Sequence, residues 1–582
     1  MRRTLLALLT GLLTGVLVLG VAWATVGLVP RRGARSVDPG EVGGGPAPAG
    51  PARQGGEQAQ AALDAATAQG RLPGGGFLVG THNESIAPVR VADGGQWNAH
   101  GDGYDCGPFE QEYLPNSDPS CLRTFDRMWA TGVDEAADLG IHARAMAISN
   151  GETTLAFVVI DTVSWFYGYD PSICPDDPNA PQPQDTCGVR AITHDLSDEL
   201  GIPVENFVIA STHTHASADT TARGPSWYYE FVRDQIKDAI RGAVSSMQPA
   251  TLQTGAIPAK AFNIDRRIVT RAVPDAELTW LRAVSIPEGQ PGNGRDKNAP
   301  PEGHTIATLV NFSAHPTVMA GNHDMHSGFI GHLAQKLEQL WGGNTVFMPG
   351  GLGDQTVQRS FGRDGIGYGL ANLVYESAQH YAYTMQSNDI VAEQRILTIP
   401  ADNASLVALN KAGVFMRDTT IPGPHAAGPS QSVQQKGRAR SPSCVGASAI
   451  SALSPVGGWR IGTPGKAQGE PGFVPGDRGD AVVMMQAPGE IFSSISLTTK
   501  DYLSRARNVM VFGMANDHIG YIIPAEQYDV RGANAAGIAQ PSIEMTNYEE
   551  SLSTGRCTGD QIQNALIEIG TNLGVLGPGE GR

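Results

Sequence analysis

The sequence predicts an α/β fold, with one large domain of mixed β-sheets flanked by helices. Three observations support this prediction. Short apolar runs typical of buried strands recur along the 582 residues of the chain. Amphipathic segments of helical length lie between several of these runs, and such alternation favours mixed or largely parallel sheet. Polar or ionisable residues follow almost every apolar run.

The predicted strands are short apolar runs bounded by polar or turn-forming residues. They are Leu155–Ile160, Phe207–Ala210, Ile306–Phe312, Thr345–Met348, Ala481–Met485 and Val509–Gly513. The predicted helices carry apolar residues at helical spacing. They are Trp227–Met247, Gly331–Trp341, Gly369–Met385, Ser494–Arg507 and Gln561–Leu573. Two polar, Gly-rich stretches, Gln96–Cys121 and Pro422–Gly479, are expected to be long surface loops.

The N-terminus predicts export. Met1-Arg2-Arg3 precedes an apolar run that extends to Val29, with a small-x-small tripeptide at Ala22-Trp23-Ala24. This pattern is typical of a secretion signal. The run also exceeds the roughly 20 residues that span a bilayer, so an uncleaved membrane anchor is the alternative. Both interpretations place the remaining chain outside the cytoplasm, either secreted or anchored to the outer face of the cytoplasmic membrane.

Residues 30–75 predict a flexible linker, because they are rich in Gly, Pro and Ala and lack sustained apolar periodicity. The expected catalytic domain occupies residues 76–582, which are enough for a large core. The formal net charge of −17 argues against nucleic acid as a partner. No protein partner is predicted.

The six cysteines form no Cys-x-x-Cys pair, which argues against a structural zinc ribbon. An even number of cysteines in an exported chain indicates disulfides. The local pairs Cys106–Cys121 and Cys174–Cys187 close the shortest loops, which leaves Cys444 and Cys557. The connectivity stays open, because sequence spacing alone does not determine it.

Ionisable residues gather where the predicted strands end. Asp161, His213, His315, Glu490 and His518 each follow a different apolar run. Ligands of open α/β sheets bind beyond the carboxyl ends of the strands, so these side chains are expected to build one polar site at one edge. Gly353-Asp354 after a Gly-rich turn is weaker evidence, because a plain turn uses the same residues. Asp161 is expected either to orient a metal-bound histidine or to act as a cap.

His213 and His215 are the strongest metal candidates. At i, i+2 on an extended segment, both side chains face the same side. A lone histidine is usually an ordinary hydrogen-bonded residue, but here His315 follows a second strand and Glu490 a third. Imidazole and carboxylate are ordinary zinc ligands. The sequence therefore predicts a metal site at the carboxyl ends of the strands.

Several of these motifs resemble those of the neutral ceramidase family, zinc amidases that cleave the N-acyl bond of ceramide. Residues 211–217, STHTHAS, are similar to that family's THTHSG motif, and residues 311–317, NFSAHPT, to its second histidine motif. GDQT at 353–356, APGE at 487–490, IGYI at 519–522 and YEESLS at 548–553 follow in the family's order, and residues 140–145 and 160–161 resemble its N-terminal portion.

The resemblance implies zinc as the cofactor and ceramide or another N-acyl compound as the substrate. It implies that the metal ligands are His213, His315, Glu490 and Tyr521. It further implies that His215, Tyr548 and Arg266 contact the substrate or the oxyanion. Thr356 occupies the position of the family's catalytic-centre serine.

Three departures from the family pattern concern the substrate. Thr356 replaces serine and lacks the following proline, and its extra methyl group narrows the pocket. Tyr528 fits the EEY that follows IGYI in the family, but extra residues separate Tyr528 from Tyr548. The chain ends soon after its last predicted helix, so the immunoglobulin-like C-terminal domain of characterised ceramidases is expected to be absent.

Three functional hypotheses follow. The first is a zinc amidohydrolase acting on ceramide or a related N-acyl lipid through metal-activated water. The second is a related exported metallohydrolase with a non-sphingolipid substrate. The third is a catalytically silent surface binding protein, against which the intact set of His213, His315 and Glu490 argues.

Overall fold

The computed structural model describes residues 76–87, 89–90, 97–98, 140–176, 178–181, 183–218, 220–221, 226–267, 273–286, 303–318, 326–413, 415–419, 450–528 and 548–577. Among these residues, no helix has the length and apolarity needed to cross a membrane. The predicted signal or anchor (1–29), the predicted linker (30–75) and the predicted loop Gln96–Cys121, apart from Trp97 and Asn98, lie outside them.

The larger sheet of the described residues has nine strands in the order β11-β10-β9-β7-β1-β4-β5-β6, with β13 paired to β7. Their bounds are β1 Phe77–Ser85, β4 His142–Ser149, β5 Thr154–Ile160, β6 Phe207–Ser211, β7 Gln248–Pro258, β9 Glu277–Ser285, β10 Thr305–Phe312, β11 Asn344–Pro349 and β13 Tyr383–Thr384. Only β10/β11 and β5/β6 are parallel in this described sheet. The mixed sheet is confirmed, while the expectation of largely parallel pairing is wrong, because β1, β4, β7 and β9 add antiparallel pairs.

A second sheet has the order β14-β15-β16-β18. Its strands are β14 Ile390–Pro400, β15 Ser451–Ile461, β16 Val482–Gln486 and β18 Asn508–Phe512. β14 and β15 pair antiparallel from Ile390↔Ile461 to Pro400↔Ser451, while β16 and β18 run parallel. The loop predicted at Pro422–Gly479 is therefore wrong over β15, because pairing along both edges satisfies the backbone of a Gly- and Pro-containing segment. Residues 420–449 lie outside the described part.

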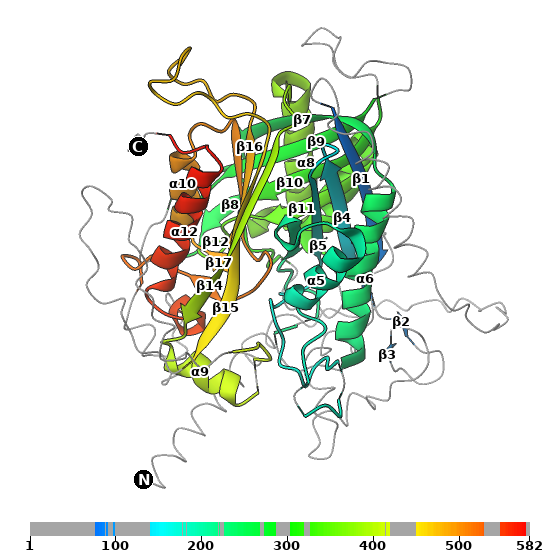
Figure 1. Ribbon diagram of the computed structural model, residues 1–582, viewed down its shortest axis with the longest axis vertical. Helices are drawn as coiled ribbons and strands as arrows, with labels where there is room; N and C mark the ends of the chain where they lie inside the picture. Colours follow the sequence, from blue (N-terminus) through cyan, green and yellow to red (C-terminus); the bar gives the residue numbers. More distant parts are fainter. Residues whose placement is uncertain are drawn as a thin grey trace, which may run out of the picture.

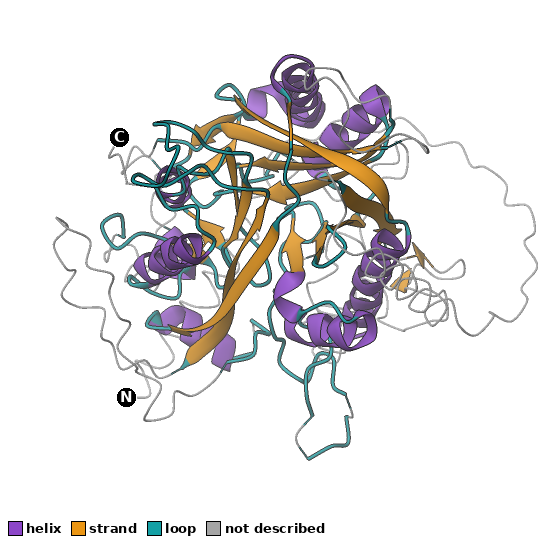
Figure 2. Ribbon diagram, turned by 45° about the horizontal axis from the view of Figure 1, so that its top comes forward, coloured by secondary structure: helices purple, strands orange, loops and turns teal. Residues whose placement is uncertain are grey.

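The two sheets pack face to face, with helices on their outer sides. Phe157 and Met146 of the larger sheet meet Trp459, Met484 and Met510 of the smaller one in a shared apolar core. Figure 1 shows α10 and α12 on one side of the sheets and α5 and α6 on the other. Figure 2 shows the strands as the inner layers and the helices around them. The alternation of strand side chains thus buries both faces of each sheet.

The five predicted helices are observed as α6, α7, α8, α10 and α12, whereas α5 and α9 were not predicted. Helices α5 (Val189–Leu200) and α6 (Ser226–Ser245) cover β4–β6, and α7 (Gly328–Trp341) and α8 (Gly362–Tyr381) cover β9–β11. Helices α10 (Ser493–Tyr502) and α12 (Thr558–Asn572) cover the smaller sheet, and the short α9 spans Ala404–Lys411. The prediction Gly369–Met385 was too long at its end, because Tyr383 and Thr384 extend the sheet as β13. Ser494–Arg507 was also too long, because α10 ends at Tyr502.

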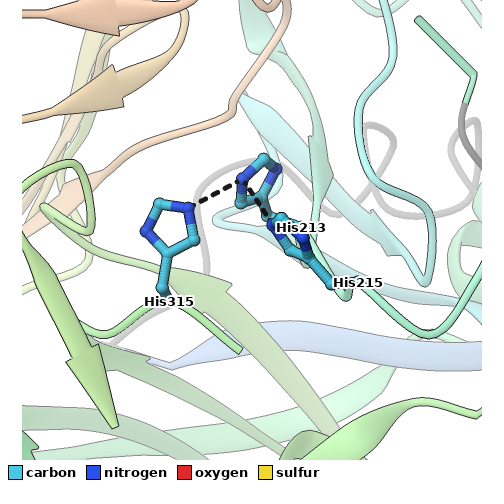
Figure 3. A group of neighbouring side chains, drawn as sticks. All are labelled: His213, His215 and His315. Carbon is cyan, nitrogen blue, oxygen red and sulfur yellow. Dashed lines mark hydrogen bonds between the residues drawn. The ribbon is translucent and has the colours of Figure 1, made fainter. Parts of the chain in front are cut away.

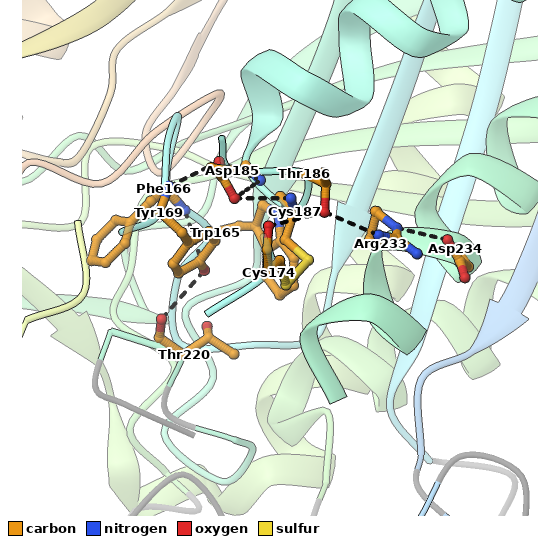
Figure 4. Close-up of a disulfide and its surroundings, with 11 residues drawn as sticks. Trp165, Phe166, Tyr169, Cys174, Asp185, Thr186, Cys187, Thr220, Arg233 and Asp234 are labelled. Atoms are coloured by element: carbon orange, nitrogen blue, oxygen red, sulfur yellow. Dashed lines mark hydrogen bonds and ion pairs between the residues drawn. A yellow bond between two sulfur atoms is a disulfide. The ribbon is translucent and has the colours of Figure 1, made fainter. Parts of the chain in front are cut away.

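One predicted disulfide is confirmed. Cys174 and Cys187 are bonded, and Trp165 donates its indole N–H to the Cys187 carbonyl at 2.9 Å (Figure 4). Asp185 accepts the backbone N–H groups of Tyr169 and Cys187 and so folds this loop beside α5. Cys557 is disulfide-bonded too. Cys106, Cys121 and Cys444 lie outside the described residues, so the other pairings stay predictions.

Candidate metal centre

The site forms where strands of both sheets end. His213 follows β6, and His315 follows β10. Glu490 begins β17 (Glu490–Ile491) after β16, and Tyr521 begins β19 (Tyr521–Ile522) after β18, with β17 and β19 paired in parallel. The predicted convergence at the carboxyl ends of the strands is thus observed. The second sheet contributes Glu490 and Tyr521.

His213 is held by the backbone around it. Its φ of 62° lies in the left-handed region, its N–H bonds to the Thr162 carbonyl at 3.1 Å, and its Nδ1–H donates to the Val163 carbonyl at 2.6 Å. The Nε2 atoms of His213 and His215 lie 3.4 Å apart (Figure 3). The two rings therefore converge through a turn after β6, and the predicted extended segment is wrong, because β6 ends at Ser211.

His315 is oriented in the same way. It is fully buried, and its Nδ1–H donates to the Leu352 carbonyl at 2.7 Å. Burial and the nearby Arg266 cation lower its pKa to about 3, so the ring is neutral at physiological pH. A neutral imidazole whose Nδ1–H is engaged presents the Nε2 lone pair.

Three lone-pair atoms meet at the centre. His213 Nε2 and His315 Nε2 are 3.1 Å apart, and they lie 3.5 Å and 3.1 Å from Glu490 Oε2. Both Nδ1 atoms donate to backbone carbonyls, so in the neutral tautomer each Nε2 presents a lone pair to this centre. Glu490 Oε2 is buried without a hydrogen-bond partner in the described structure. A buried acceptor facing two further acceptors is explained by a cation, and imidazole with carboxylate suits zinc.

His215 lies with these histidines rather than apart from them. The ligand atoms of His213, His215 and His315 all lie within 4.8 Å of one another, and His215 is the most exposed of the three. The structure thus allows His215 to act either as a ligand or as the predicted substrate contact on the open side.

Glu490 has a partner that the sequence prediction left without a role. His518 Nε2 lies 3.2 Å from Glu490 Oε1. This contact engages one oxygen of the carboxylate, while the other oxygen faces His213 and His315. The available signal for His518 was its position after the apolar run that forms β18.

Arg266, Tyr521 and Tyr548 form a second group beside the histidines. Arg266 donates to the Tyr521 hydroxyl at 2.8 Å, and the Tyr521 and Tyr548 hydroxyls are 3.2 Å apart. Burial raises the pKa of Tyr548 to about 12 and that of Tyr521 well above its usual range, so both phenols are protonated donors. The Tyr521 ring stacks on His315 with centroids 6.3 Å apart, and its role as a metal ligand stays a prediction.

Thr356 reaches the site on β12 (Gln355–Val357). This strand pairs with β8 (Asn263–Asp265), which leads directly into Arg266. Thr356 also bridges to His315, whose N–H donates to the Gln355 carbonyl at 3.1 Å. The Thr356 hydroxyl lies 2.9 Å from that of Thr317. All eight predicted site residues therefore lie on strands or turns that meet at this centre.

Asp161 and Asp354 make contacts outside the histidine centre. The Val163 carbonyl, not Asp161, orients His213. The Asp161 carboxylate instead accepts the His142 N–H at 3.0 Å. Asp354 accepts the Ser493 N–H at 2.7 Å and the Ser493 hydroxyl at 2.6 Å. It therefore anchors the start of α10.

Comparison with known proteins gives a likeness of structure. No protein-family model matches the chain, and no curated protein matches its sequence. The neutral ceramidase from Pseudomonas aeruginosa matches with a TM-score of 0.52 and 14% identity, covering 85% of this chain and 74% of that one. A structure described as ceramidase complexed with C2 gives a TM-score of 0.54 and 15% identity, covering 87% and 76%. The chain therefore shares the fold of the neutral ceramidases over most of its length.

Proposed function

We propose that the chain is a zinc-dependent amidohydrolase that cleaves the N-acyl bond of ceramide, or of a related N-acyl lipid, to a fatty acid and an amine. The observation that carries the proposal is the convergence of His213 Nε2, His315 Nε2 and Glu490 Oε2, with both Nδ1–H groups engaged by backbone carbonyls. The shared ceramidase fold supports the same conclusion. The sequence pattern at residues 1–29 extends the proposal to action outside the cytoplasm.

The ligands for zinc would be His213, His315 and Glu490, with Tyr521 as the fourth ligand that the resemblance implies. When bound, zinc acidifies water to a pKa of about 7 and polarises a carbonyl. The Val163 and Leu352 carbonyls keep the two histidines in the ligating tautomer.

Donors for the oxyanion of a tetrahedral intermediate lie beside this set. Burial works against the charge of Arg266, but nearby carboxylates, Glu549 among them, help to raise its pKa, so the guanidinium stays cationic. The protonated phenol of Tyr548 is within reach of the same cation, which also contacts Tyr521. Donors fixed before the reaction lower the barrier by stabilising charge as it develops. His215, on the more exposed side, suits proton exchange with the leaving amine.

The test is hydrolysis of a panel of N-acyl substrates, including a fluorescent ceramide, by protein of measured metal content. Fatty acid release that stops with a chelator and returns with Zn²⁺ is expected. Glu490→Gln, which keeps the side-chain shape, is expected to lose both zinc and activity. Glu152→Gln, an exposed change in the β4–β5 turn, serves as the matched control.

The other hypotheses are separate outcomes of this experiment. Zinc-dependent activity confined to short polar amides would favour a metallohydrolase with a non-sphingolipid substrate. Stoichiometric zinc without hydrolysis of any substrate would favour the silent binding protein. Protein without stoichiometric zinc, together with a His213→Ala variant of unchanged activity, would reject the proposal.

A further inference from the structure

The two carboxylate oxygens of Glu490 have different surroundings. Oε2 faces His213 and His315 at 3.5 Å and 3.1 Å. Oε1 lies on the other side, 3.2 Å from His518 Nε2. As a metal ligand, the carboxylate would accept this hydrogen bond from His518. One oxygen therefore faces the candidate metal position while the other is occupied by a hydrogen bond.

His518 itself is held firmly. Its backbone N–H donates to its neighbour Asp517 at 2.8 Å, and its ring stacks on Phe166 with centroids 6.3 Å apart and planes 16° apart. The preceding turn has left-handed residues at Met514 and Asn516. The Asn516 side chain accepts the Ile209 N–H at 2.7 Å, which fastens the turn to β6.

Asp517 connects this turn to distant parts of the chain. Its side chain is completely buried and accepts the Tyr167 N–H at 2.9 Å and the Ser454 hydroxyl at 2.5 Å. Arg417 forms an ion pair with the same carboxylate. A buried carboxylate with this many donors is rigid, so the position of His518 is fixed by residues of both sheets and their connections.

We propose that His518 is a positioning residue that holds Glu490 as a one-oxygen ligand of the metal, with Asp517 fixing His518 in turn. This inference rests on the proposed function. The last torsion of a glutamate side chain is soft, so an unrestrained carboxylate turns easily to offer both oxygens. Keeping Oε1 engaged leaves a coordination position open, which a catalytic zinc site needs.

The test is the affinity for Zn²⁺ alone, measured by competition with a chromophoric chelator at constant pH. His518→Phe keeps an aromatic ring against Phe166 and removes the donor, and is expected to weaken binding about 10- to 100-fold. His518→Gln keeps an N–H donor and is expected to restore most of the affinity. A purely structural role for the ring predicts the opposite order, with Phe better than Gln.

The control is His304→Gln, at the opposite end of β10 from His315, where His304 bonds to Ser285. Folding of each variant is checked by circular dichroism, and His518→Ala replaces the Phe variant if that one does not fold. Co²⁺ in place of Zn²⁺ gives a second readout, because its visible spectrum changes with coordination number.

The outcomes separate the two proposals. Wild-type protein that binds no Zn²⁺ would reject the proposed function and this inference together. Wild-type protein that binds Zn²⁺, with the Phe or Ala variant binding equally tightly and giving the same Co²⁺ spectrum, would overturn this inference alone.

Discussion

Arg266 donates one guanidinium N–H to the hydroxyl of Tyr521 at 2.8 Å, and the same nitrogen reaches the Gly353 carbonyl at 2.8 Å. The cation also lies over the Tyr548 ring, 5.4 Å from its centroid. One buried charge therefore fixes both phenols beside the histidine centre. Both phenols are protonated and add no negative charge beside the cation, whose Nε lies 3.5 Å from the Glu549 carboxylate.

Arg266→Met is expected to lower kcat about 100- to 1,000-fold, the usual cost of removing one preorganised oxyanion donor. Zinc content should stay at the wild-type level, because no metal ligand is changed. Steady-state kinetics with a fluorescent N-acyl substrate and metal analysis of the same samples check both points. Arg395→Met, in an ion pair on β14, is the control. Loss of zinc from the Arg266 variant would contradict the assigned role.

The Thr356 hydroxyl is expected to act as a hydrogen-bond donor to the substrate. The Thr317 hydroxyl accepts from Arg359 at 3.1 Å and shares a hydrogen bond of 2.9 Å with the Thr356 hydroxyl, in which either hydroxyl can donate. Thr356→Val keeps the shape and loses the hydroxyl, so kcat/KM should fall roughly tenfold. Thr356→Ser should stay near the wild type. Equal activity of the Val and Ser variants would show that the hydroxyl has no part in the reaction.

The strands that the sequence predicted are those buried on both faces. Leu155–Ile160 and Ile306–Phe312 lie between two cores, so apart from Asn311 their residues are apolar or small and the runs are visible. β14 was missed because its residues are mostly half-buried and include Glu393, Gln394 and Arg395. β15 was missed because Pro455, Gly457 and Gly458 resemble a loop until their pairing with β14 is known.

The site was predictable to the extent that it depends on strand ends. His213, His315 and Glu490 follow apolar runs directly, so their convergence follows from the fold class. The role of His518 depends on a turn with left-handed Met514 and Asn516, both non-glycine residues, which no local pattern indicates. The carbonyls of Val163 and Leu352 that orient the rings are backbone groups and leave no sequence signal.

Asp161 is expected to make stability depend on pH. Burial, only partly offset by Arg144 and the His142 N–H, raises its pKa from 3.8 to about 6. The native state therefore keeps a proton that the unfolded chain loses between these values. Protonated Asp161 therefore contributes about 3 kcal/mol to the unfolding free energy, relative to its ionised form, at pH values below 3.8. This contribution is lost as the pH rises to about 6.

Asp161→Asn removes this titration. The unfolding free energy of the variant relative to the wild type should therefore rise by up to about 3 kcal/mol between pH 4 and pH 7. Urea denaturation at a series of pH values measures it, with Asp195→Asn on the exposed face of α5 as the control. Parallel stability curves for the Asp161 variant and the wild type would contradict the prediction.

The last prediction concerns the support of Tyr548. Arg267, next to Arg266, has a completely buried side chain that contacts Glu550 at 2.7 Å and Glu549 at 3.3 Å. Removing one member of a buried ion pair costs about 3–5 kcal/mol, because the partner stays buried without compensation. Arg267→Met should therefore destabilise the protein by that amount, and kcat should fall because Glu549 and Tyr548 are consecutive.

Glu550→Gln should lower the unfolding free energy by less than Arg267→Met does, since Glu549 still pairs with Arg267. Denaturant unfolding of both single variants and the double variant measures the coupling. Additive effects in this cycle would show that Arg267 and Glu550 do not act as a pair.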